Sequence, residues 1–219
     1  MDHWNLSHAV VAPSDDLVAV RNEEGNCRMM ALMQAYPDRF SGLAAANPWY
    51  GQDAVSILHV AFEQGLVGLY LNPARQGFRL TESIVDPLIE TCAAYGKPVY
   101  SSTGTPVCAM PFQLAELARR HPQVRFVMGH SAWSDFSGYD VILAAKQAGN
   151  ILVETSCTTG GLVKAIIGEI GETRVVFGSG YPRSHPLVEI GKIQRLGLAQ
   201  STMQRVMSEN ARDLWGLRQ

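Results

Sequence analysis

Residues 124–131 read Val124-Arg125-Phe126-Val127-Met128-Gly129-His130-Ser131. An apolar run this short, with β-branched and aromatic residues and a closing glycine, predicts a buried strand. His130 then lies at the carboxyl end of that strand, which in a barrel or an open α/β sheet is the edge where ligands bind. His130 is therefore the first candidate site residue, although a histidine at such a place also serves simply to hydrogen-bond a neighbouring loop.

On both sides of this strand the chain alternates short apolar runs with segments of helical periodicity, such as Ala54, Leu58 and Ala61 at spacings of four and three. Strict alternation without a hairpin signal requires parallel strands joined by right-handed crossovers. We expect a single domain over residues 1–219 with an α/β fold, either a (β/α) barrel or a doubly wound sheet. The seven predicted strands lie at residues 9–12, 40–46, 67–71, 97–101, 124–129, 151–154 and 174–177.

The composition excludes several classes of function. The chain is 47% hydrophobic and 17% charged with a net charge of -2, so it presents no basic face for nucleic acid or for a membrane surface. Its apolar runs are shorter than the ~20 residues that span a bilayer, and its first residues lack the features of a secretory signal. The four widely spaced cysteines indicate buried thiols of a reducing compartment. We expect a cytoplasmic protein that binds a small molecule.

A series of segments, in one order and at one spacing, resembles the amidohydrolase superfamily. The resemblance is to the branch of TIM-barrel metal-dependent hydrolases that includes aminocarboxymuconate-semialdehyde decarboxylase, and it runs from His8 to Trp215. It implies a barrel rather than an open sheet. The segments are Tyr36-Pro37-Asp38-Arg39-Phe40 before a strand that ends at Asn47-Pro48, Gly65-Leu66-Val67-Gly68-Leu69, Gly96-Lys97-Pro98-Val99, Phe126-Val127-Met128-Gly129-His130, Glu154-Thr155-Ser156 and Phe177-Gly178-Ser179-Gly180-Tyr181-Pro182.

The resemblance also implies one divalent metal ion, usually zinc, at the carboxyl ends of the strands. Its ligands in the family are a His-x-His on the first strand, a histidine that ends the fifth and an aspartate that ends the eighth. A histidine that ends the sixth strand is often a further ligand or the catalytic base. Imidazole and carboxylate ligands hold Zn²⁺ while leaving a position for a water molecule, whose pKa falls to about 7.

This chain departs from the family pattern at most of the ligand positions. Residues 6–11 match the second strand of the family, so the sequence lacks the first strand and its His-x-His. Ser102 stands where the fifth-strand histidine belongs, and Gly180 stands where the eighth-strand aspartate belongs. One imidazole with a hydroxyl group and a glycine is too little to hold zinc tightly. We therefore expect no bound metal, with His130 as a ligand if zinc or another divalent ion is retained by other donors.

Other residues at the strand ends are candidates for catalysis or binding. His130 and Glu154 end neighbouring strands, which predicts a general base oriented by a carboxylate, although Glu154 suits a structural role as well. Residues 158–161 and 178–180 form either a phosphate-binding corner or ordinary turns. The candidate substrate-binding residues are Ser102, Thr103, Trp133, Tyr181, Arg183 and His185.

Two hypotheses of different class follow. The first is an enzyme or pseudoenzyme of the amidohydrolase type with a largely lost metal site. As a hydrolase or lyase it would act on a small carboxylate or on a cyclic amide or ester, with His130 as the acid-base group. The second is a non-catalytic binding or scaffold protein built on the same barrel. Polar groups that converge on His130 favour the enzyme, whereas an apolar barrel mouth favours the scaffold.

The missing first strand has a further consequence. A barrel without it has two strand edges with unpaired backbone groups, and such edges pair readily with another chain. We expect a homodimer whose contact covers the gap. Two alternatives are that residues 1–8 fold into the gap, or that the strands rearrange into an open sheet.

Overall fold

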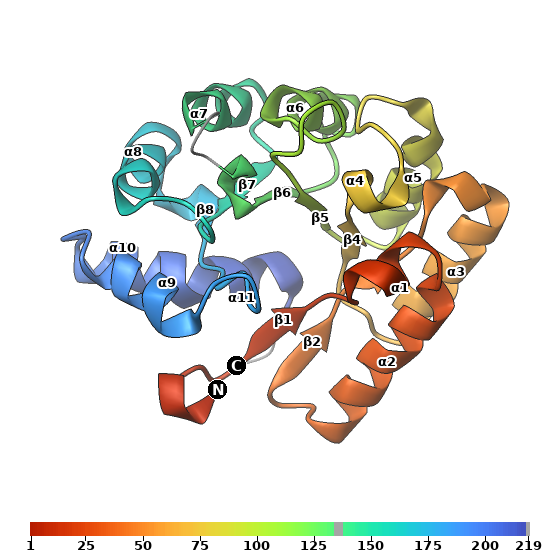
Figure 1. The fold of residues 1–219 in the computed structure, drawn as a ribbon, viewed down its shortest axis with the longest axis horizontal. Helices are drawn as coiled ribbons and strands as arrows, with labels where there is room; N and C mark the ends of the chain where they lie inside the picture. Colours follow the sequence, from red (N-terminus) through yellow and green to blue (C-terminus); the bar gives the residue numbers. More distant parts are fainter. Residues whose placement is uncertain (134–137, 218–219) are drawn as a thin grey trace.

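The computed structural model describes residues 1–133 and 138–217, and shows parallel strands surrounded by helices (Figure 1). Strand β1 (Ala9–Val11) pairs with β2 (Phe40–Gly42), and β3 to β8 form a second sheet in sequence order. Every pairing between these named strands is parallel. The other strands are β3 (Ala44–Ala45), β4 (Leu69–Leu71), β5 (Val99–Ser102), β6 (Phe126–Gly129), β7 (Ile151–Glu154) and β8 (Val175–Val176).

The strands β2 and β3 are the two halves of one predicted strand, separated at Leu43. β2 pairs with β1, whereas β3 pairs with β4. The hydrogen bonding continues across the break, because the Leu43 N–H donates to the Val11 carbonyl (2.8 Å) and the Val67 N–H donates to the Gly42 carbonyl (2.9 Å). The seven predicted strands are therefore confirmed, and they form one curved wall, a (β/α) barrel left open between β1 and β8.

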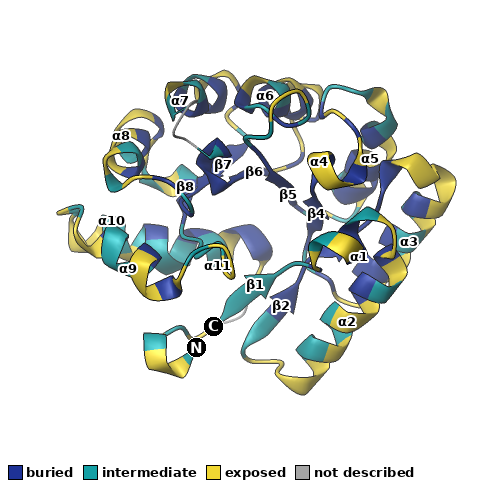
Figure 2. Ribbon diagram, in the orientation of Figure 1, coloured by how far each residue is buried: buried dark blue, intermediate teal, exposed yellow. Residues whose placement is uncertain are grey.

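Helices cover the outside of this wall (Figure 1), and buried residues concentrate on the strands and on the helix faces that meet them (Figure 2). Side chains alternate along each strand: in β6, Phe126 and Met128 pack among the helices, whereas Val127 points into the barrel interior. Both faces are buried, which explains the continuous apolar runs of the sequence. The helices are α1 (Asp15–Ala19), α2 (Asn22–Ala35), α3 (Gln52–Glu63), α4 (Pro73–Gln76), α5 (Asp86–Ala94), α6 (Pro111–Arg120), α7 (Gly138–Gln147), α8 (Gly160–Ile170), α9 (Pro186–Gln194), α10 (Gln200–Gln204) and α11 (Asn210–Trp215). Within the two described ranges, none of them combines the length and the apolar character of a membrane-spanning helix.

The C-terminal helices, blue in Figure 1, lie in the sector between β8 and β1. Leu214 and Trp215 of α11 join the apolar cluster of the barrel interior. The Trp215 ring lies against Gly68, just before β4, where an added Cβ would come within 2.5 Å of it. Arg125, just before β6, donates to the Leu214 carbonyl (2.8 Å). Helix α11 therefore closes the end of the barrel at which the strands begin.

The same C-terminal segment satisfies the outer edge of β8. Asn210 Nδ2 donates to the Val175 carbonyl (2.7 Å), and the Phe177 N–H donates to the Val206 carbonyl (2.9 Å). One of the two edges that predicted a partner chain is thus covered within the chain itself.

The outer edge of β1 has no partner strand among the described residues. β1 is half-buried along its length. The residues before β1 lie near this sector, since the Trp4 ring packs edge-on against His185 (5.3 Å between ring centroids) and Arg39 donates to the Leu6 carbonyl (3.1 Å). The predicted homodimer stays a prediction, and β1 is the edge that it would use.

Candidate functional site

A buried carboxylate joins the carboxyl ends of β5, β6 and β7. The two side-chain oxygens of Glu154 accept four hydrogen bonds, from the Tyr100 hydroxyl (2.9 Å), the His130 N–H (2.8 Å), the Ser156 hydroxyl (2.8 Å) and the Ser156 N–H (2.6 Å). Three of these bonds fall on Oε2 and one falls on Oε1, so Oε2 is saturated with donors. Such partners are what allows a charge to be buried. Glu154 therefore holds three strand ends together and does not face a ligand.

Glycines at neighbouring strand ends make room for this carboxylate. An added Cβ on Gly178 would lie 1.9 Å from Glu154 Oε1, and one on Gly129 would lie 2.5 Å from the Tyr100 ring. Burial raises the pKa of the Tyr100 hydroxyl well above its usual value, and the nearby Glu154 charge raises it further. Tyr100 therefore stays protonated and acts as a donor to Glu154.

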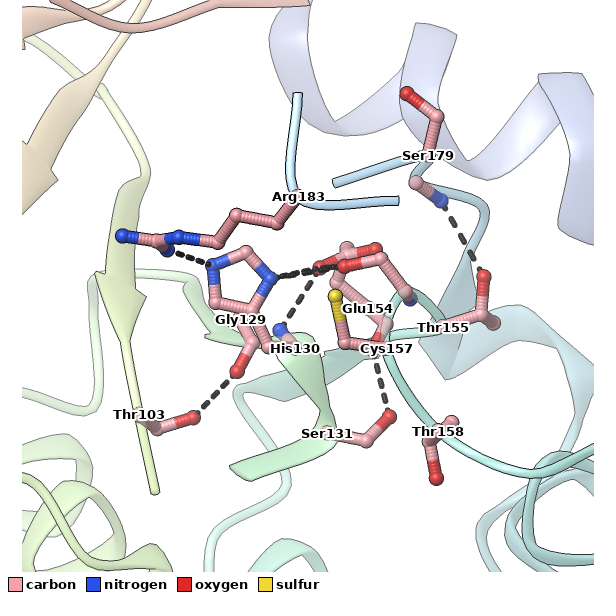
Figure 3. A network of polar contacts seen from close by, with 12 residues as sticks. Thr103, Gly129, His130, Ser131, Glu154, Thr155, Cys157, Thr158, Ser179 and Arg183 are labelled. Carbon is pink, nitrogen blue, oxygen red and sulfur yellow. Dashed lines mark hydrogen bonds and ion pairs between the residues drawn. The ribbon is translucent and has the colours of Figure 1, made fainter. Parts of the chain in front are cut away.

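The imidazole of His130 is connected to Glu154 through Ser156. His130 Nδ1 lies 2.9 Å from Ser156 Oγ and 3.7 Å from Glu154 Oε2. Because the Ser156 hydroxyl donates its single proton to Glu154, it must accept one from Nδ1, and we infer that the neutral ring carries its proton there. Nε2 is then the unprotonated nitrogen, which accepts from Arg183 Nη1 (3.5 Å). In Figure 3 the ring lies between Glu154 on one side and Arg183 on the other.

Burial lowers the pKa of His130; the Glu154 charge opposes this shift, and the Arg183 charge adds to it. The net direction is downward, so the imidazole is neutral at pH 7. A neutral ring with Nε2 unprotonated can accept a proton, and a hydroxyl group lies between it and Glu154, the carboxylate expected to orient it.

The backbone that carries His130 is strained. Residues 130–133 have φ values of 59°, 43°, 54° and 49°, all in the left-handed region. Non-glycine residues in that region cost roughly 1–2 kcal/mol each, so surrounding contacts must hold the turn. Ser131 Oγ donates to the Glu154 carbonyl (2.7 Å), and Thr103 Oγ1 donates to the Gly129 carbonyl (2.6 Å). These contacts keep the His130 and Trp133 rings together, with 4.9 Å between their centroids.

Arg183, from the loop after β8, covers Nε2 of His130. Its Nη1 lies 3.5 Å from Nε2, its Nη2 donates to Asp15 Oδ2 (3.2 Å), and its Cζ lies 5.4 Å from the centroid of the Trp133 ring. Asp15 begins α1 and also pairs with Arg75 Nε (3.2 Å). An ion pair therefore links the loops after β1 and β8, the two strands between which the barrel is open.

The structure brings together four of the predicted site residues, namely His130, Glu154, Trp133 and Arg183. Ser102 is buried at the end of β5, where it is opposite Gly129 of β6.

The other predicted binding residues have different roles. Thr103 is fully buried and its hydroxyl is used on the Gly129 carbonyl. Tyr181 is 68% exposed. His185 precedes α9 and caps it, its Nδ1 accepting from the Leu187 N–H (3.3 Å). No hydrogen bond, ion pair or ring contact among the described residues joins Tyr181 or His185 to His130, whereas Arg183 of the same loop reaches it.

Three residues of the site, Ser156, Asp15 and Tyr100, were not predicted in these roles. Glu154 and Ser156 are two residues apart, and side chains at that spacing along an extended backbone lie on the same side. Asp15 follows the end of β1, so it lies at the same edge of the barrel as His130, but its sequence context indicates only a helix start. Tyr100 alternates with Val99 and Ser101 and therefore points into the barrel.

The side chain of Lys192 lies beside the first of the two loops considered as a phosphate-binding corner. Its Nζ donates to the carbonyls of Thr155 (2.7 Å) and Thr158 (3.0 Å) and pairs with the buried Glu189. Thr159 caps α8 with its own hydroxyl. These contacts stabilise the turn after β7, and the phosphate-binding corner stays a prediction.

The side chains present do not fit a divalent metal ion. Across residues 1–133 and 138–217, no three histidine, cysteine or acidic side chains are grouped as metal ligands. Both oxygens of Glu154 accept hydrogen bonds from the protein, and Asp15 is paired with two arginines. Gly180 has a φ of 59°, and an added Cβ would lie 2.9 Å from Ser156 Oγ. A ligand at position 180 would thus require the site to rearrange, which leaves one imidazole where zinc sites use three or four protein ligands.

A family model described as amidohydrolase matches residues 7–217. No curated protein matches the chain.

Several solved structures share the fold. The 5-carboxyvanillate decarboxylase of Sphingomonas paucimobilis is 16% identical, with a TM-score of 0.82 over 100% of this chain and 81% of that chain. The 2,6-dihydroxybenzoate decarboxylase from Rhizobium is 16% identical, with a TM-score of 0.78 over 99% and 86%. The 5-carboxyvanillate decarboxylase of Novosphingobium aromaticivorans, complexed with manganese and 4-hydroxy-3-methoxy-5-nitrobenzoic acid, is 18% identical, with a TM-score of 0.81 over 99% and 78%. At these identities the likeness establishes the fold alone.

Proposed function

The chain belongs to the amidohydrolase family, and on this premise we propose that the mouth of its barrel binds a small carboxylate, with His130 as the acid-base group and without a bound metal ion. The ligand class is supported by the names of the similar structures, which are decarboxylases of substituted benzoic acids. It is also supported by the chemistry at the site, since a guanidinium group is well suited to pair with a carboxylate.

The observation that carries this proposal is the chain of contacts from Glu154 through Ser156 to His130. It leaves Nε2 as an acceptor, 3.5 Å from the permanently charged Arg183. The cation would bind the anionic substrate, and the neighbouring base would exchange a proton with it. Arg183 pairs with Asp15 in the absence of ligand, so a ligand carboxylate would compete with Asp15 for the same guanidinium.

The test is calorimetric titration with 2,6-dihydroxybenzoate and unsubstituted benzoate. We expect the R183Q variant to bind at least about tenfold more weakly than the wild type, because it loses a charge-assisted pair. The exposed Arg119 provides the control, and R119Q is expected to bind as the wild type does. Equal affinity of R183Q and the wild type, or no binding of either acid, would overturn the carboxylate proposal.

Turnover of the bound acid separates an enzyme from a binding protein. The enzyme proposal predicts product formation by the wild type and none by H130Q, with ligand binding retained in both. A non-catalytic binding protein is the second candidate. It is favoured by the closure of the site, because His130 is only 7% exposed and no buried side-chain nitrogen or oxygen among the described residues lacks a hydrogen-bond partner. If the wild type binds the acid but forms no product, the protein is a non-catalytic binding protein.

A further inference from the structure

We propose that the guanidinium group of Arg183 takes the place of a metal ion in this site. It is the cation that faces the unprotonated Nε2 of His130, and its presence excludes a divalent ion from that position. The inference does not depend on which ligand the barrel binds.

The first support is the space beside the imidazole. Arg183 Nη1 lies 3.5 Å from His130 Nε2, whereas zinc lies about 2.0–2.1 Å from a histidine nitrogen. An ion on the same line at that distance would overlap the Arg183 nitrogen. The nitrogen that would bind a metal is thus already covered by a cation.

The second support is that the guanidinium group is held in place from three sides. Asp15 pairs with Nη2 (3.2 Å), the Trp133 ring lies below Cζ (5.4 Å), and His130 faces Nη1. These partners come from the loops after β1 and β6, while Arg183 itself follows β8. Arginine stays protonated at every relevant pH, so its charge repels a second cation under all ordinary conditions.

The third support is the state of the remaining acidic groups. Asp15, the carboxylate with which Arg183 pairs, is neutralised by Arg183 and Arg75 together. Position 180 holds a glycine with a positive φ, and Ser156 and Cys157 fill the space into which its side chain would extend (2.9 Å and 3.1 Å from an added Cβ). Position 180 thus offers no side-chain donor and no space for one, and Arg183 supplies a positive charge at the site.

The test uses metal ions alone, without any organic ligand. Wild-type protein, R183A and R75A are titrated with Zn²⁺ by calorimetry and with Co²⁺ by visible absorption. R75A is the matched control, since Arg75 is the other arginine partner of Asp15. We expect the wild type and R75A to bind these ions only weakly, and R183A, in which His130 Nε2 and Asp15 are both uncovered, to bind them at least about tenfold more tightly, because the competing charge is removed. The H130N/R183A double variant should lose this binding again.

Two results would overturn the proposal. One is a metal ion that the wild type binds at one equivalent and that H130N loses. The other is equal metal affinity of R183A and the wild type. Far-UV circular dichroism establishes that each variant is folded, and R183Q, which keeps most of the bulk of the side chain, replaces R183A if the latter does not fold. Failure of the benzoate titration would leave these results unaffected.

Discussion

Glu154 is the residue on which the barrel mouth depends, because donors from three strand ends converge on its two oxygens. Replacement by glutamine turns one acceptor oxygen into a donor that faces other donors in a buried place. We predict that E154Q lowers the free energy of unfolding by about 2–3 kcal/mol. Urea unfolding measures this change.

The control for this prediction is Glu169, which pairs with Lys146 on the surface and has a side chain 52% exposed. E169Q should change the free energy of unfolding by less than about 0.5 kcal/mol, since exposed ion pairs contribute little. Losses of equal size in the two variants would mean that Glu154 is not the centre of the network.

His130 gives the stability of the protein a pH dependence whose sign follows from its surroundings. Burial lowers its folded pKa, an effect that Glu154 opposes and Arg183 reinforces, whereas in the unfolded chain the pKa is about 6.5. Below that pH the unfolded chain binds a proton that the folded protein does not. The stability linked to His130 is therefore complete above pH ~6.5 and declines as the pH falls towards the folded pKa.

The H130Q variant removes this titration and leaves the five other histidines in place. We predict that its free energy of unfolding falls less than that of the wild type between about pH 7 and about pH 5. Denaturant unfolding at a series of pH values measures both proteins. Parallel curves would show that His130 has the same pKa in the folded and unfolded chains.

At the scale of residues, the sequence predicts what strand ends present but not how loops turn. His130 and Glu154 were predictable because each directly ends or follows a buried apolar run. Tyr181 and His185 lie in the same loop after β8, yet it is Arg183 that points towards His130. Its guanidinium group pairs there with Asp15. That pairing joins residues 168 apart in the sequence, and neither periodicity nor spacing contains a signal for it.

At the scale of elements, two glycines differ in what their backbones require. Gly180 has a φ of 59° and crowded surroundings, whereas Gly161 in α8 has open space around it. We predict that G180A lowers the free energy of unfolding by about 1–3 kcal/mol. G161A should raise it by up to about 1 kcal/mol, because alanine favours the helix. Thermal and urea unfolding of both variants test the difference, and a change of the same sign in both would contradict it.

The strands themselves were predictable from their apolar runs, because strands buried on both faces leave few polar positions. The interruption at Leu43 was not. β2 and β3 are both short and largely buried, and only the change of partner from β1 to β4 separates them. Which strand pairs with which half depends on the curvature of the barrel, a property of the assembled wall rather than of any one segment.

At the scale of the whole molecule, the strand pattern predicted two exposed edges, but not the way in which the chain covers one of them. Asn210 reaches back to the carbonyl of Val175, and the Val206 carbonyl accepts from Phe177. Contacts between a helical segment and a strand edge follow no period, so the sequence pattern did not indicate them. The C-terminal segment is thus part of the barrel and not an appendage to it.

Trp215 tests this conclusion, because it is 8% exposed and lies with Val127 and Leu152 in the interior cluster. We predict that W215A lowers the free energy of unfolding by about 3–5 kcal/mol through the cavity it leaves. The matched control is Tyr139, which is 72% exposed, and Y139A should change the free energy by less than about 0.5 kcal/mol.

Amide hydrogen exchange supplies a second readout for the same variant. The Phe177 N–H is protected by the Val206 carbonyl (2.9 Å), in the segment just before α11. If Trp215 anchors that segment, the Phe177 amide should exchange faster in W215A under conditions where the protein is still folded. The amides within β6, which pair with β5 and β7, should keep their protection. Unchanged exchange at Phe177, together with a stability equal to that of Y139A, would contradict the prediction. It would show that packing of Trp215 does not stabilise the barrel.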